Sequence, residues 1–195
     1  MLHEKLKSYR LILASQSPRR QALIKGLDVP VTLAPAYHVD EAFPPEMPKE
    51  EVPIFLARAK SGAYPHPLDD RDVLITADTL VWCKGEFLGK PAGEADARRM
   101  LRLMSGSTHE VLTGVCLRSS RQTKTFLSST LVRFRPLAED EISYYLSAYQ
   151  PYDKAGAYGI QEWIGYAAIE RIEGSYYNVM GLPMQRLYVE LEKMI

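Results

Sequence analysis

The chain has little cysteine, no long hydrophobic run and no excess of either charge. Its 195 residues include two cysteines, Cys83 and Cys116, without Cys-x-x-Cys spacing, which disfavours a disulfide framework and a zinc site. Both lie in apolar stretches and are interpreted as buried free thiols, so the expected compartment is reducing, most simply the cytoplasm. No stretch approaches the length of a membrane span, and residues 1–15 lack the apolar core of a secretory signal.

The absence of net charge narrows the classes of partner. Lys and Arg number 24, and so do Asp and Glu, which gives a formal charge of zero. Nucleic acid polymers and anionic membranes select for a basic excess, so neither is expected as the main partner. The common P-loop and dinucleotide-binding glycine signatures are also missing. The length suits one domain, or one domain with two lobes.

The hydrophobic pattern predicts strands alternating with helices. A hairpin and a pair of neighbouring strands interrupt this alternation, which predicts an α/β fold with a mixed sheet instead of a purely parallel one. The expected strands are residues 10–15, 29–37, 73–83, 86–88, 109–118, 125–134 and 167–172. The expected helices are residues 18–26, 54–63, 94–104, 138–149 and 183–194.

A strand-to-helix turn near the start of the chain is the first candidate site. Ser17 and Pro18 form a strong helix start, with a hydroxyl cap followed by proline at the first helical position. Arg19 and Arg20 then have the wrong charge for a helix N-terminus. A phosphate bound there, in contact with the arginines and with Ser15, would compensate for this charge. A capped helix with solvated arginines explains the same pattern, and the local sequence does not decide between the two.

Asp78 is the second candidate, because it lies in the middle of an apolar strand. A carboxylate buried there is unfavourable unless it is paired, hydrogen-bonded or bound to a metal, so a functional role is favoured. Asp40 and Glu41 resemble ordinary loop acids when taken alone. Lys60 likewise resembles a helix-surface cation.

Three later segments have weaker signals. Lys90 lies between glycine and proline in a tight turn, where it either contacts phosphate or is solvated. His109 has no acid near it in sequence, and a structural role is favoured. The glycine- and alanine-rich loop 153–161 ends at Gln161, whose amide either reads a base edge or lies at the surface.

Taken in order, these segments resemble the Maf family over residues 12–190. The similar motifs are SxSPRR, Asp-Glu, a helical lysine, ADT, GKP, SGxTHxVxTG, DKAGAYGIQ and GSYxNVxGLP. The resemblance implies a two-lobed α/β fold related to inosine triphosphate pyrophosphatases (Maf/Ham1-like), with the active site in the cleft between the lobes. A single Maf-like domain would span residues 1–195, and a homodimer is compatible with the family.

The resemblance also implies an activity, the hydrolysis of nucleoside triphosphates between the α- and β-phosphates with a divalent cation, Mg²⁺ or Mn²⁺. Asp78 would accept the proton of the attacking water, and Glu41 would help Asp78 to hold the cation. The side chains implied at the triphosphate are Ser15, Ser17, Arg20, Lys60 and Lys90.

Within the family, Arg19, Thr79 and Gln161 match the subgroup that acts on dTTP and UTP. Modified pyrimidine nucleotides are compatible substrates, as for a house-cleaning enzyme. The alternatives are a 7-methyl-GTP-type pyrophosphatase and a nucleotide-binding regulator of cell division without turnover. One departure from the family is Gln150, where an acidic residue is expected before Pro151.

Overall fold

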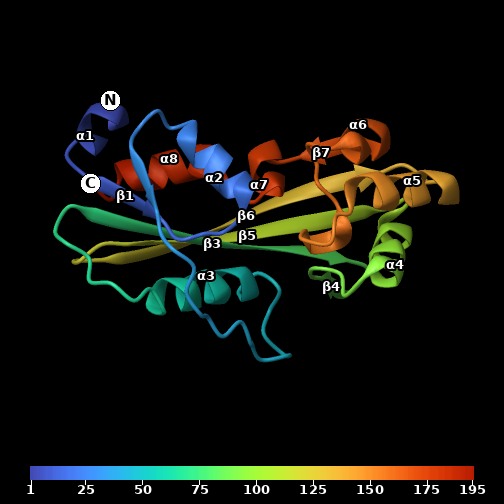
Figure 1. Ribbon diagram of the computed structural model, residues 1–195, viewed down its shortest axis with the longest axis horizontal. Coiled ribbons are helices and arrows are strands. Elements are labelled where there is room, and N and C mark those ends of the chain that lie inside the picture. The colour runs from blue at the N-terminus through green and yellow to red at the C-terminus, as the bar shows by residue number, and fades with distance from the viewer. The chain divides into compact units, whose positions relative to one another are not determined.

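A computed structural model describes residues 1–195 as a mixed α/β protein with one seven-stranded sheet (Figure 1). The strands are β1 (Arg10–Leu13), β2 (Val31–Leu33), β3 (Asp72–Cys83), β4 (Glu86–Leu88), β5 (Thr108–Arg118), β6 (Thr123–Phe134) and β7 (Ile169–Glu173). Their order is β2-β1-β3-β5-β6-β7, with β4 beside β3. β1 is parallel to β2 and β3, whereas the β3–β4 and β6–β7 pairs are antiparallel. The predicted mixed sheet is therefore confirmed.

The helices agree with the predicted ones where the sequence has clear end signals. They are α1 (Leu2–Leu6), α2 (Pro18–Lys25), α3 (Val52–Gly62), α4 (Glu94–Met104), α5 (Glu139–Tyr149), α6 (Trp163–Ala168), α7 (Tyr176–Met180) and α8 (Met184–Glu192), with a 3₁₀ turn η1 (Ala155–Ala157). The short helices α1, α6 and α7 were not predicted. The strand predicted over residues 29–37 is limited to residues 31–33, because prolines at positions 30 and 35 lack the amide hydrogen that pairing requires.

The chain divides into two compact units. The first contains Met1–Asp78, Thr113–Ser128 and Gly181–Ile195, and the second contains Thr79–Leu112 and Ser129–Met180. The long strands β3, β5 and β6 contribute residues to both units.

In the first unit, helices cover both faces of the strands. Alternate residues of β1 and β3 face one side, where Leu11 and Ile75 pack with α1, α2 and α8. The intervening residues, such as Ile12 and Leu74, face the other side. Figure 1 shows α3 on that side of the strands and α1, α2 and α8 on the opposite side. This arrangement follows from the period-two alternation of strand side chains.

The second unit has its own core, built on α4 and α5. Leu101 and Met104 of α4 pack with Tyr145 and Leu146 of α5 in one buried cluster. The loop after α5 closes over this cluster through the buried Tyr158 and Ile160, together with other buried residues of β3 and β6.

Candidate active site

The turn between β1 and α2 lies directly beside β3 in the first unit. The amide of Ala14 donates to the carbonyl of Ile75 at 3.0 Å, which continues the parallel pairing past the end of β1. Ser17 caps α2, and its side chain accepts a hydrogen bond from the amide of Arg20 at 3.5 Å. Ser15 Oγ accepts from the amide of Ser17 at 3.2 Å. The predicted capped turn is confirmed, and it opens beside the strand that carries Asp78.

Arg20 reaches from the first turn of α2 toward two carboxylates. Its Nε donates to the carbonyl oxygen of Gly181 at 2.7 Å, which fixes the guanidinium against the turn before α8. Burial lowers the pKa of Arg20, while the nearby carboxylates of Asp78 and Glu41 act in the opposite direction. The guanidinium therefore belongs to the same charged cluster as these acids and is not simply solvated.

Lys60 joins the two acids. It lies on α3, and its ammonium group donates a hydrogen bond to Asp78 Oδ1 on β3. The same nitrogen lies 3.1 Å from Glu41 Oε1. Asp78 is only 8% exposed, whereas Glu41 lies in an exposed loop. The buried acid in the middle of the strand is therefore paired, as a carboxylate in that environment must be.

The position of Lys60 depends on how closely α3 approaches the strands. A Cβ at Gly114 of β5 would lie 2.2 Å from the carbonyl carbon and oxygen of Pro53, so only glycine permits this contact. Thr76 Oγ1 donates to the carbonyl of Ala57 at 2.7 Å, and Tyr37 donates to the carbonyl of Lys60 at 2.8 Å. These contacts fix the start, middle and end of α3 over the strands and hold Lys60 against Asp78.

The carboxylates of Glu41 and Asp78 fit a divalent cation. Both converge on one ammonium nitrogen in this structure, so their oxygens are able to face a common positive charge. No group of three or more His, Cys, Asp or Glu side chains is arranged to hold a metal ion. Two carboxylates nevertheless suffice for Mg²⁺, which commonly takes its remaining ligands from water and substrate phosphates. Asp40 instead accepts from the amide of Ala42 at 3.0 Å within its own loop.

Three more of the residues predicted to contact the nucleotide belong to the second unit, whereas Arg19 lies on α2 in the first unit. Thr79 follows Asp78 on β3 and is half-buried. Lys90 is exposed in the turn after β4. Gln161 ends the loop that follows α5, and its Oε1 is shielded from solvent without a hydrogen-bond partner. The roles of these three residues remain predictions.

Two other expectations concern residues outside the charged cluster. His109 is buried, and its Nε2 shares a 2.8 Å hydrogen bond with the hydroxyl of Tyr158. Burial lowers the pKa of His109 to about 3, so the side chain is neutral and structural, as predicted. Cys83 and Cys116 are buried free thiols, which is also confirmed.

One group beside Gln161 was not predicted from the sequence. Tyr145, Lys154 and Glu162 form a buried hydrogen-bonded network under the loop. The sequence offers one faint signal, since Glu162 and Lys154 are charged residues flanking an apolar loop that the fold buries.

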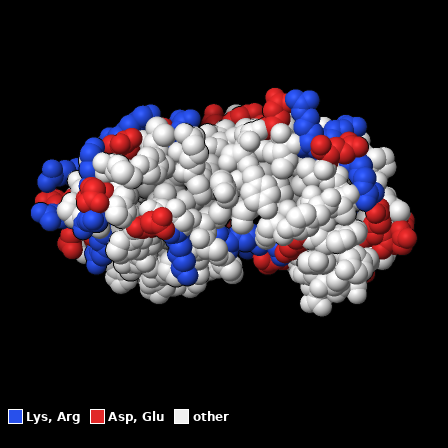
Figure 2. Space-filling model, turned by 90° about the horizontal axis from the view of Figure 1, so that it is seen from above, with Lys and Arg blue, Asp and Glu red and all other residues white.

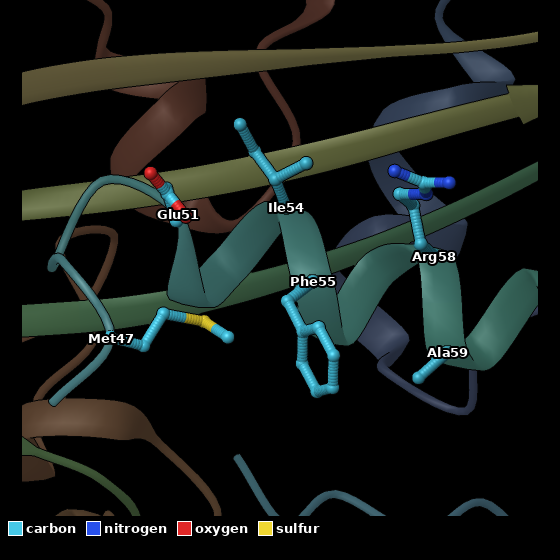
Figure 3. Close-up of a pocket in the computed structure, with 6 residues that line it drawn as sticks. All are labelled: Met47, Glu51, Ile54, Phe55, Arg58 and Ala59. Atoms are coloured by element: carbon cyan, nitrogen blue, oxygen red, sulfur yellow. The ribbon is translucent and has the colours of Figure 1, made fainter. Parts of the chain in front are cut away.

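A pocket of about 540 Å³ lies on the outward side of α3 (Figure 3). Met47, Ile54, Phe55 and Ala59 supply its apolar surface, and Glu51 and Arg58 supply its charges. None of the residues predicted to contact the nucleotide lines this pocket. The pocket therefore shares no lining residue with the cluster around Asp78.

Charge is mixed over the visible surface. On the face shown in Figure 2, Lys and Arg side chains are interspersed with Asp and Glu side chains, and neither sign forms a continuous patch. None of the helices combines the length and the apolar composition that a membrane crossing requires.

Comparison with known proteins identifies the family of this chain. Residues 10–194 match the family described as Maf-like protein, and the chain belongs to that family. A dTTP/UTP pyrophosphatase of Bacteroides fragilis is 51% identical over 189 residues, covering 97% of this chain and 98% of the relative. A dTTP/UTP pyrophosphatase of Flavobacterium johnsoniae is 45% identical over 195 residues, covering 100% of both chains.

Solved structures are more distant. A HAM1 protein from Coxiella burnetii is 14% identical, with a TM-score of 0.44 over 95% of this chain and 99% of that one. A nucleoside-triphosphatase (dITP/XTP pyrophosphatase) from Mycobacterium abscessus is 15% identical, with a TM-score of 0.37 over 66% of this chain and 75% of that one.

Proposed function

We propose that this protein is a nucleoside triphosphate pyrophosphatase that hydrolyses dTTP and UTP to the monophosphate and pyrophosphate. The observation that carries the proposal is the buried carboxylate of Asp78, paired with Lys60 and close to Arg20 and Glu41. The pyrimidine preference rests on the relatives named dTTP/UTP pyrophosphatase, which are 45–51% identical over almost the whole chain.

The charged cluster supports a role for each residue in this reaction. Water attacks the α-phosphorus, the bond to the oxygen bridging the α- and β-phosphates breaks, and pyrophosphate leaves. Asp78 is the acceptor for the proton of the attacking water. Arg20 and Lys60 donate hydrogen bonds to the phosphates, and Ser15 and Ser17 contact them at the start of α2.

A divalent cation, Mg²⁺ or Mn²⁺, would be held by Glu41 and Asp78 and would lower the pKa of bound water. Within the same proposal, Thr79, Arg19 and Gln161 contribute to the choice of base, and Lys90 contacts the phosphates. We also propose that the protein acts in the cytoplasm, in keeping with its two free thiols. A homodimer is compatible with the proposal.

The test measures pyrophosphate release from a panel of nucleoside triphosphates with Mg²⁺ or Mn²⁺. The wild type should turn over dTTP and UTP faster than 7-methyl-GTP. Asp78→Asn should lower kcat roughly 10²- to 10⁴-fold, the usual contribution of a positioned general base. If this variant kept its turnover, Asp78 would have no such role.

Asp72→Asn is the matched control. Asp72 lies on the same strand, is 2% exposed, and accepts from Arg10 Nε at 2.8 Å, so it is another buried paired aspartate. Its substitution should lower stability while leaving kcat of the folded protein unchanged. Tight nucleotide binding by the wild type without pyrophosphate release would instead indicate a binding protein.

A further inference from the structure

The loop from Asp153 to Gln161 has a conformation that its sequence alone does not favour. Gly156 and Ala157 have positive φ angles of 71° and 55°, and the side chain of Ala157 is fully buried. A left-handed conformation is unfavourable for any residue with a Cβ. The buried Oε1 of Gln161 also has no hydrogen-bond partner, which is a further cost. Other contacts in the second unit must therefore hold the loop in place.

A buried carboxylate supplies these contacts. Glu162 Oε1 lies 3.1 Å from the ammonium nitrogen of Lys154, and Glu162 Oε2 accepts a hydrogen bond from the hydroxyl of Tyr145. That hydroxyl in turn accepts from the amide of Gly159 at 3.0 Å. The side chains of Lys154 and Glu162 are only 10% and 17% exposed. Lys154 also pairs with the exposed carboxylate of Asp153 at 2.7 Å.

The carboxylate of Glu162 folds back tightly over the loop. A Cβ at Gly159 would lie 2.8 Å from Glu162 Cδ, so a side chain at that position would displace the carboxylate. Glu162 is also the N-cap residue of α6, and its carbonyl accepts from the amide of Gly165 at 2.9 Å. One residue thus ties the loop to α5 through Tyr145 and to the start of α6.

The same loop contacts the turn that carries Lys90. The amide of Gly156 donates to the carbonyl of Gly89 at 3.1 Å. A Cβ at Gly156 would lie 3.0 Å from Val81 Cγ2 on β3, so the loop backbone packs directly on this strand. The position of the loop therefore fixes the backbone next to Lys90 as well as Gln161.

We propose that Glu162, held by Lys154 and Tyr145, is a positioning residue that sets Gln161 for reading the pyrimidine base. This inference rests on the proposed pyrophosphatase function. A buried ion pair contributes little to stability compared with apolar side chains of similar volume. What such side chains cannot replace is the chain of hydrogen bonds from Glu162 through the Tyr145 hydroxyl to the Gly159 amide. The network therefore acts on loop geometry.

Three variants test the network. Glu162→Gln removes the charge, and Tyr145→Phe removes the hydroxyl while retaining the ring that stacks on Tyr149 and Trp163. Each should lower kcat/KM for dTTP about 10- to 100-fold, by analogy with the loss seen when residues that orient a metal ligand are replaced. The double variant Lys154→Met/Glu162→Leu replaces the ion pair with apolar side chains. It should regain the thermal stability of the wild type, but its kcat/KM for dTTP should stay as low as in the single variants.

Two readouts separate positioning from simple stabilisation. The first is the ratio of kcat/KM for dTTP to that for dCTP, because thymine presents an acceptor where cytosine presents an amino donor. All three variants should reduce this ratio, mainly through a higher KM for dTTP. The second is amide hydrogen exchange over residues 153–162, which should become faster in every variant without nucleotide.

Controls are available on the same helix. Tyr144→Phe removes a hydroxyl from an exposed tyrosine of α5, and Glu141→Gln breaks the 2.6 Å pair with Arg135 at the start of α5. Both should leave the dTTP:dCTP ratio and the exchange of the loop unchanged. If the double variant had the kcat/KM of the wild type, packing alone would hold the loop, and the proposal would be overturned.

The two proposals fail in different ways. A wild-type protein that released no pyrophosphate from any nucleotide would refute the pyrophosphatase function and the base-reading role together, and hydrogen exchange would still show whether Glu162 orders the loop. A wild type that is active on dTTP, combined with a Glu162→Gln variant of unchanged ratio and unchanged exchange, would refute the positioning role alone.

Discussion

Acid should destabilise the fold through His109, because the structure keeps this side chain uncharged. The ring is 1% exposed and lies edge-on to Phe134 and Tyr158, with centroids 4.9 and 5.3 Å away. Its one hydrogen bond joins Nε2 to the Tyr158 hydroxyl at 2.8 Å, and Nδ1 has no partner. Burial lowers the pKa of His109 to about 3.

The sign and size of the effect follow from this pKa. In the unfolded chain the pKa of a histidine is about 6.5, so between these two values the unfolded state binds more protons than the folded state. The contribution of neutral His109 to stability is therefore complete above about pH 6.5, the pKa in the unfolded chain. It is lost as the pH falls from this value toward the pKa of the folded protein. Each unit of pH costs up to about 1.4 kcal/mol, which gives roughly 2 kcal/mol at about pH 5.

Urea unfolding of the wild type and His109→Gln measures this contribution. Glutamine keeps a hydrogen-bonding group near Tyr158 but does not titrate. The free energy of unfolding of the wild type should exceed that of the variant by more at about pH 7.5 than at about pH 5. The difference between the two proteins should shrink by roughly 2 kcal/mol between these pH values. Carboxylates with lowered pKa values, such as Glu190 at about 2, affect both proteins equally and cancel in the difference. A margin independent of pH would refute the assignment of a buried neutral histidine.

Two further predictions concern packing. Gly114→Ala places a methyl group 2.2 Å from backbone atoms of Pro53, so it should cost about 1–3 kcal/mol or more and lower kcat by shifting α3. Gly62 lies on α3, and a Cβ there would meet no atom within 4 Å, so Gly62→Ala should change neither the melting temperature nor kcat substantially. If both variants behaved alike, the close approach of α3 to β5 at Gly114 would be contradicted. Cys83 and Cys116 should react with a thiol reagent only after unfolding, because burial raises both thiol pKa values; rapid labelling of the native protein would oppose this.

Elements with strong local signals were predicted well from the sequence. The helix over residues 94–104 has apolar residues on one face and matches α4 at both ends. The Lys84-Gly85 turn has positive φ angles of 47° and 92°, as expected for a two-residue hairpin. In both cases the deciding interactions lie within a few residues of each other, and a single sequence contains them.

Elements that depend on distant packing were not predicted. Helices α1 and α7 have five residues and α6 has six, which is too short for stability without tertiary contacts. In α1, for example, Leu2 and Leu6 are buried in the core of the first unit. The sequence contains these leucines but gives no indication of what they pack against.

The residues of the candidate site also differ in how well the local sequence predicts them. Asp78 stands out in sequence, because an acid within a buried strand requires a partner. Its partner Lys60 looks like a surface cation, and Glu41 looks like a loop acid, until α3 is placed over β3. Family resemblance identified these two residues, whereas the local pattern did not. The network of Lys154 and Glu162 was missed altogether, since flanking charges in a loop normally indicate solvation.

The charge balance around Asp78 explains why a buried acid is tolerated and what a ligand then requires. Arg20 and Lys60, from α2 and α3, offset the carboxylates of Glu41 and Asp78, so the cluster has no net charge of its own. A polyanionic triphosphate cannot be neutralised by a cluster that is already balanced. Additional positive charge therefore has to arrive with the nucleotide. On this argument a divalent cation and the nucleotide should each strengthen the binding of the other, because each supplies the charge that the other lacks.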